Sequence, residues 1–181
     1  MTIKYTLTRE DYLQMQLFAA SKSPRIIKSR NKSRWLLSIV YVALGIVLMI
    51  NANDVFALTF ILFGIGWYFY HPSMMRRRYK RHFEKYIDET LANRFDKTVE
   101  LSFEEDFLME KSPMGESKVN LSEVTAVFET NDYFYIEFSS GQYAIIPKDR
   151  IMNLPDFSNF IKEMTVKLSA PFREELDWKW K

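Results

Sequence analysis

Two long apolar segments separated by a short polar loop constrain this chain more than any other feature. Segments 35–53 and 55–72 contain no Asp, Glu, Lys or Arg, and His71 is their one histidine. Each reaches the roughly 18 apolar residues that are typical of a membrane-spanning helix. We therefore expect a transmembrane helical hairpin over 35–72, with Asn51–Asp54 as its loop.

Basic residues flank the hairpin on both outer sides, whereas its loop carries one negative charge. Lys and Arg in short flanks remain on the cytoplasmic side, so the pattern predicts a multi-pass protein of the inner (cytoplasmic) membrane with both termini cytoplasmic. Such residues also attract anionic lipid headgroups, by about 1 kcal/mol each near the surface. The predicted lipid-contacting residues are Arg25, Lys28, Arg30, Lys32, Arg34, Arg76, Arg77, Arg78, Lys80 and Arg81.

The two halves of the chain carry opposite charge, although the net charge is only +2. Residues 1–97 have 16 basic and 7 acidic side chains, and residues 98–181 have 9 basic and 16 acidic ones. An acidic C-terminal half does not fit nucleic-acid binding. The absence of cysteine excludes disulfides, thiol catalysis and cysteine-ligated metals.

The segment before the hairpin, 1–34, predicts a strand followed by a basic helix. Ile3–Leu7 alternates apolar and polar residues, and Thr8 with the acidic residues after it favours a helix start. A second basic helix is expected over 73–97, beginning after Pro72. Because a lone strand is unstable, we predict that Ile3–Leu7 joins the sheet formed from residue 98 onward, which makes the hairpin an insertion within one fold.

Beyond residue 97 the spacing of the apolar residues changes from the period of a helix to the two-residue period of a strand. This change predicts a new domain over 98–170. The alternation predicts six short strands, at 98–103, 107–111, 117–121, 124–130, 133–139 and 142–147. A helix from Leu154 with one apolar face follows, and 171–181 is an aromatic and charged tail. The predicted fold class is an α+β membrane protein, in which a cytosolic antiparallel β barrel or sandwich is closed by a C-terminal helix.

Several short motifs, taken in order, resemble one known family. They are Tyr5–Thr8 with Asp11–Tyr12, Val119–Val124, Glu129–Phe134 and Ile145–Lys148, together with the paired spans. The chain resembles the YcxB-like family of bacterial membrane proteins. The resemblance implies a pleckstrin-homology-like C-terminal domain and carries no catalytic residues.

Pleckstrin-homology folds often bind phosphates through basic residues in the loop after the first strand, which the pattern places here at 98–103. That loop reads Glu104-Glu105-Asp106, and its three negative charges would repel a phosphate. The same carboxylates are typical of a solvated turn rather than of acid and base catalysis. His71 and His82 lie among cationic residues, so we expect no metal site. The sequence contains no Gly-rich phosphate loop and no Ser-centred elbow, so we expect no cofactor and no catalytic residue.

Aromatic residues offer a second candidate interaction surface, made of Tyr133, Tyr135, Tyr143, Trp178 and Trp180. The tyrosine face either binds a peptide or packs against the helix of residues 79–95. The tryptophans beside lysines either dock at a membrane or protein interface or belong to a mobile end.

These observations predict a non-enzymatic membrane protein that displays a pleckstrin-homology-like module to the cytosol. The expected partners are the anionic bilayer and an unknown protein or a second copy of the chain. The alternative is a membrane component of a transporter or of a membrane enzyme complex. That function requires polar groups within the spans, where the sequence offers only Ser38, Tyr41, Thr59 and glycines.

Overall fold

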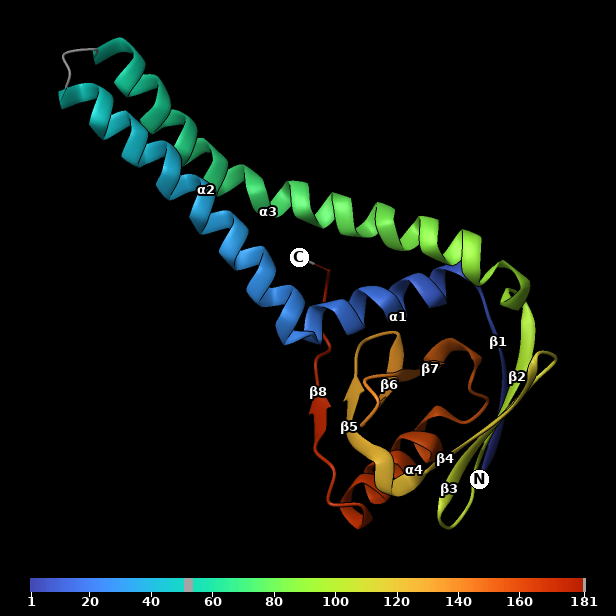
Figure 1. Ribbon diagram of the computed structural model, residues 1–181. Coiled ribbons are helices and arrows are strands. Elements are labelled where there is room, and N and C mark those ends of the chain that lie inside the picture. Colours follow the sequence, from blue (N-terminus) through green and yellow to red (C-terminus); the bar gives the residue numbers. More distant parts are fainter. Residues whose placement is uncertain (51–53, 181) are drawn as a thin grey trace. The chain divides into compact units, whose positions relative to one another are not determined.

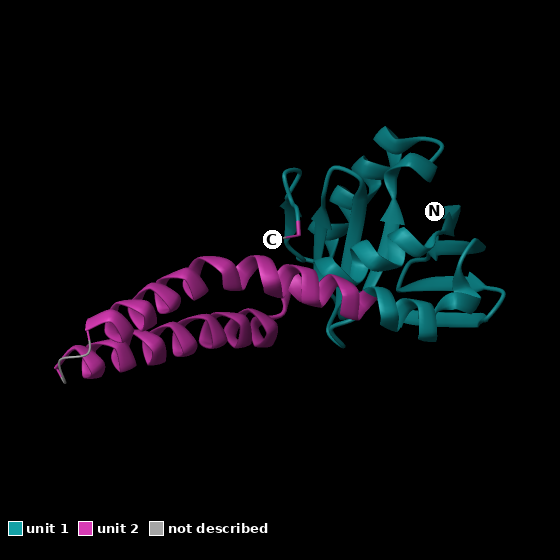
Figure 2. Cartoon of the chain, turned by 90° about the horizontal axis from the view of Figure 1, so that it is seen from above, with its two compact units in different colours: residues 1–19, 84–179 teal, residues 20–83, 180–181 magenta. Residues whose placement is uncertain are grey.

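The computed structural model describes residues 1–50 and 54–180, which form two compact units. Unit 1 contains residues 1–19 and 84–179, and unit 2 contains residues 20–83 together with Trp180 (Figure 2). The predicted loop residues Asn51–Asn53 lie outside the described residues.

Unit 1 is an α+β domain with two four-stranded sheets (Figure 1). The first is antiparallel, in the order β1 (Thr2–Leu7), β2 (Lys97–Phe103), β3 (Phe107–Ser112) and β4 (Gly115–Asn120). The second has the order β7 (Tyr143–Pro147), β6 (Tyr133–Phe138), β5 (Val124–Glu129) and β8 (Phe172–Glu174). All six strands predicted after residue 97 are present, whereas β8, which pairs in parallel with β5, was not foreseen.

The pairing of β1 with β2 confirms that the N-terminal strand joins the later sheet. The register runs from Thr2 opposite Ser102 to Leu7 opposite Lys97. The two long helices are therefore inserted in the sequence between neighbouring strands of one sheet. A consequence is that Glu104–Asp106 follows the second strand of the domain, so its placement after the first strand was wrong.

Helix α4 (Leu154–Lys167) completes the core of unit 1. The Asn153 side chain caps it by accepting the Asp156 backbone N–H, and a proline lies in its first turn. Phe157 is fully buried, and its ring lies 6.0 Å from Phe103 of the first sheet and 5.6 Å from Phe134 of the second. The apolar face of α4, which the sequence predicted, thus packs against both sheets.

Helix α1 (Arg9–Lys22) begins as expected from its capping residues. Thr8 N–H donates to Asp11 Oδ2 at 2.7 Å, and Asp11 N–H donates to Thr8 Oγ1 at 3.4 Å. These two hydrogen bonds form a reciprocal capping box. Three 3₁₀ turns, η1 (Ala92–Arg94), η2 (Leu121–Glu123) and η3 (Lys148–Arg150), link the other elements of unit 1.

Unit 2 is built on helices α2 (Pro24–Ile50) and α3 (Asp54–Thr90), the latter up to residue 83. By length and composition, these two described helices can each cross a membrane. Gly45 and Gly64 let them approach, since an added Cβ would lie 2.8 Å from Ala57 O and 3.0 Å from Ser38 O respectively. Gly66 has no such role, because a Cβ added there meets no atom within 4 Å.

Helix α3 continues through Pro72, whereas the sequence predicted a new helix after this residue. Proline has no backbone N–H, so the carbonyl of Tyr68 loses its intrahelical donor. Arg34 of α2 supplies the missing hydrogen bond, since its Nε donates to Tyr68 O at 3.0 Å. The helix therefore tolerates Pro72 because a side chain from the neighbouring helix satisfies the carbonyl.

Candidate functional site

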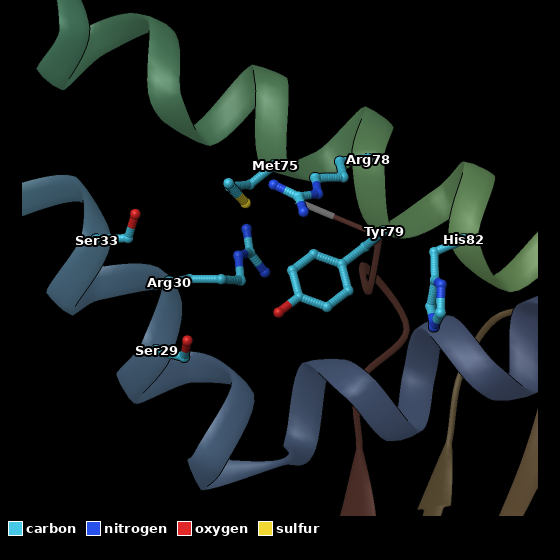
Figure 3. A pocket seen from close by; sticks show the side chains of 7 residues that line it. All are labelled: Ser29, Arg30, Ser33, Met75, Arg78, Tyr79 and His82. Carbon is cyan, nitrogen blue, oxygen red and sulfur yellow. The ribbon is translucent and has the colours of Figure 1, made fainter.

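A pocket lies inside unit 2, beside the basic regions that flank the two apolar segments. It has a volume of about 410 Å³ and lies between α2 and α3 (Figure 3). The residues that line it are Ser29, Arg30, Ser33, Met75, Arg78, Tyr79 and His82. Two of the ten predicted lipid-contacting residues, Arg30 and Arg78, thus face one space from opposite helices.

The lining is rich in hydrogen-bond donors and poor in acceptors. Each guanidinium carries five N–H groups, and the Ser and Tyr hydroxyls add donors that can also accept. None of the described residues that line the pocket is acidic. Such a lining favours an anion with several oxygen atoms.

Trp180 forms part of the surroundings of this pocket within unit 2. The Arg30 guanidinium lies 5.1 Å from the centroid of the Trp180 ring, and the Tyr79 ring lies 6.2 Å from it. The indole Nε1 donates to Arg76 O at 3.1 Å. Trp180 therefore holds two pocket residues by ring contacts while its own N–H is bound to α3.

Helical spacing explains the pocket, although the sequence analysis missed it. Positions 75, 78, 79 and 82 recur at intervals of three and four and therefore share one face of α3. Positions 29, 30 and 33 do the same on α2. This signal was available in the sequence, but the pairing of the two faces depends on how the helices pack.

The other predicted lipid-contacting residues have different surroundings. Arg34 is half-buried, and besides its bond to Tyr68 O its guanidinium lies 3.7 Å from the centroid of the Tyr68 ring. The remaining seven are exposed: Arg25, Lys28, Lys32, Arg76, Arg77, Lys80 and Arg81.

The residues of the predicted aromatic surface belong partly to the core of unit 1 and partly to the C-terminal tail. Tyr135 is fully buried and stacks on Phe18 of α1 with centroids 4.0 Å apart, so it belongs to the core. Tyr143 and Trp178 meet the edge of the same Phe18 ring, at 5.9 and 5.2 Å. The tyrosine face is thus covered by α1, and Trp178 is docked on the domain.

A buried polar cluster in unit 1 gathers residues from several of the motifs quoted for the family resemblance. The Asp11 side chain is 2% exposed; it pairs with Arg150 and accepts the Tyr133 hydroxyl at 3.0 Å. Burial raises the pKa of the Asp11 carboxyl, but hydrogen bonds from Arg150, Thr8 and Tyr133 outweigh it and hold this pKa below its usual value. Every donor around the carboxylate comes from the protein itself, so this cluster ties α1 to β6 and η3.

The two histidines have different surroundings. His71 is buried, with its Nε2 3.2 Å from Ser33 Oγ, and His82 lines the cationic pocket. Among residues 1–50 and 54–180, no three His, Cys, Asp or Glu side chains are placed to hold a metal ion.

The geometry defines an α+β protein with a pair of long apolar helices inserted after its first strand and a cationic pocket between those helices. Residues 103–161 match the family model described as YcxB-like protein, which confirms the predicted resemblance over the segment from the end of β2 into α4. Searches of curated proteins and of solved structures gave no match.

Proposed function

We propose that this protein is a membrane-anchored, non-enzymatic module, in which α2 and α3 span the bilayer and unit 1 is displayed to the cytosol. The observation that carries the proposal is the exposure of large apolar side chains on both helices. Ile50, Val55 and Phe69 are 80%, 78% and 73% exposed, and similar side chains cover both helices over the apolar segments. The core helix of a soluble protein would bury such a face, so an apolar solvent is the economical explanation.

The charge pattern supports an orientation for the hairpin. Exposed basic residues flank the apolar part of both helices on the same side, while Asp54 begins α3 at the other. By the positive-inside rule this places both termini in the cytoplasm.

A cysteine-labelling experiment tests anchoring and orientation together. The chain has no cysteine, so Asp54→Cys and Ser122→Cys each introduce a single reactive thiol. A membrane-impermeant maleimide applied to intact spheroplasts should label Asp54→Cys, whereas Ser122→Cys should react only after permeabilisation. The reverse pattern, or equal labelling of both, would refute the proposal.

The role of the displayed domain is to bind a protein partner or a second copy of the chain, through a pleckstrin-homology-like fold. Two sheets closed by a C-terminal helix support that fold assignment. Strand β4 supports the binding role, because no other described strand pairs with its outer edge and its backbone groups there remain open to another strand.

Photocrosslinking tests this role directly. A crosslinker in place of Glu116 on β4 should give a discrete adduct in native membranes, and one in place of Glu163 on α4, which is also exposed, should not. An adduct of twice the chain mass would indicate self-association. Identical patterns from both positions would count against a specific interface on β4.

A further inference from the structure

We propose that the pocket between α2 and α3 binds a phosphate group, presented either by a phosphomonoester lipid headgroup or by a soluble phosphate. Its volume of about 410 Å³ falls in the range of small-ligand sites, roughly 300 to 1,000 Å³. A diffuse attraction of lysines and arginines to the bilayer needs no such pocket. The pocket is therefore a defined binding site within the basic region.

The donors converge from both helices in a manner that suits a tetrahedral oxyanion. Arg30, Arg78 and Tyr79 project into the space between the helices (Figure 3). A guanidinium presents paired N–H groups that match two phosphate oxygens, so two guanidiniums together can engage all the oxygens of one phosphate. The Ser29 hydroxyl lies on the α2 wall and adds a neutral donor, whereas the Ser33 hydroxyl lies 3.2 Å from His71 Nε2.

The composition of the lining favours an anion over a cation in this pocket. Two positive side chains contribute to the described lining, and none of the lining residues is acidic. Trp180 assists as a positioning residue, because its ring lies 5.1 Å from the Arg30 guanidinium. Ring contact of this kind limits the rotamers of a long side chain before the ligand arrives.

The position of the pocket along the helices matches the depth of lipid phosphates. It begins at Ser33, just before the apolar segment that starts at Trp35, and at Met75, just after the second apolar segment. Both helices change from apolar to basic at this level, which is where a bilayer presents its headgroups. The proposal that a lipid supplies the phosphate thus rests on the proposed membrane anchoring, whereas the proposal of phosphate binding does not.

Binding to defined nanodiscs tests the proposal. The full chain is placed in phosphatidylcholine nanodiscs, and fluorescent phosphatidic acid is titrated in. The double variant Arg30→Gln/Arg78→Gln should bind about 100-fold more weakly than the parent, at roughly tenfold for each lost charged contact. The matched control Lys28→Gln/Arg77→Gln removes the same charge from exposed positions outside the pocket and should change binding less than threefold.

Further measurements distinguish a lipid phosphate from a soluble phosphate and check that the protein is folded. If 10 mM inorganic phosphate displaces the lipid from the parent, the site also takes soluble phosphate; if it does not, the lipid is the ligand. Repeating the phosphate titration in detergent micelles, read by tryptophan fluorescence, keeps the test independent of membrane anchoring. Circular dichroism on both double variants checks that each is folded.

Equal weakening by the two double variants would overturn the proposal, since it would show that bulk charge attracts the lipid. Trp180→Ala gives an additional readout of positioning. It should weaken binding several-fold in the parent and have no further effect in the Arg30→Gln background.

Discussion

The contact between Arg34 and the carbonyl of Tyr68 gives the sharpest prediction about the hairpin. Pro72 removes the N–H that would bond Tyr68 O, and the Arg34 Nε donates to this oxygen at 3.0 Å. We expect Arg34→Ala to destabilise the hairpin strongly in the parent chain and weakly in the Pro72→Ala background. The reason is that Pro72→Ala restores the helical N–H that Arg34 replaces.

The magnitude follows from two separate contacts. A hydrogen bond from a charged group contributes about 1.5 to 3 kcal/mol. The guanidinium also lies 3.7 Å from the centroid of the Tyr68 ring, a cation–π contact of about 0.5 to 2 kcal/mol. Arg34→Ala should therefore cost about 2 to 5 kcal/mol in the parent, and only the cation–π share in the Pro72→Ala background. The coupling energy of the double-mutant cycle should be about 1.5 to 3 kcal/mol.

Equilibrium unfolding in mixed dodecyl maltoside and dodecyl sulfate micelles, followed by circular dichroism, measures all four corners of this cycle. Arg77→Ala serves as the matched control, because Arg77 is exposed on α3, and should change stability by less than about 0.5 kcal/mol. If Arg34→Ala costs the same in the parent and in the Pro72→Ala background, the hydrogen bond to Tyr68 O does not compensate for Pro72. That result would refute the reasoning, and the ring contact or a lipid contact would then explain the cost.

Two other predictions concern close packing in unit 2 and the buried cluster in unit 1. Gly45→Ala should destabilise the hairpin by about 1 to 3 kcal/mol in the same micelle assay, because its new Cβ would lie 2.8 Å from Ala57 O. Gly66→Ala, with open space around it, is the control and should not destabilise it. Asp11→Asn should destabilise unit 1 by about 3 kcal/mol through loss of the ion pair with Arg150. Because the pKa of Asp11 is lowered, its contribution is complete above the ordinary value of 3.8 and disappears as the pH falls through the lower folded pKa. Acid titrations followed by tryptophan fluorescence should therefore show a stability loss below about pH 4 in the parent that is smaller in Asp11→Asn, and equal losses would contradict this assignment.

Local pattern predicted most of the secondary structure, because each element carries its own period and its own end signals. Alternation located β2 to β7, and Thr8 with the acidic residues after it located the start of α1. The prediction that β1 joins the later sheet is confirmed, since a strand without a partner cannot bury its apolar side chains.

The errors arise where a distant residue changes the local outcome. Pro72 normally ends a helix, and α3 continues through it because Arg34, on the preceding helix, bonds the free carbonyl. Strand β8 has only three residues and forms because β5 provides a parallel edge. The tyrosine face read as a candidate binding surface is covered by Phe18, whose position depends on how α1 packs.

Residue type and spacing were enough to predict the two apolar segments, their basic flanks and the order of strands β1 to β7 followed by α4. Those properties depend on residue type and spacing along one segment, so no knowledge of neighbours is needed. The packing of α2 against α3 fixes which of their faces meet. It therefore places Arg30 and Arg78 in one pocket and lets Arg34 bond the Tyr68 carbonyl that Pro72 leaves free. Contacts between separate helices depend on the close approach at Gly45 and Gly64, and a one-dimensional pattern does not specify the helix rotation that this packing sets.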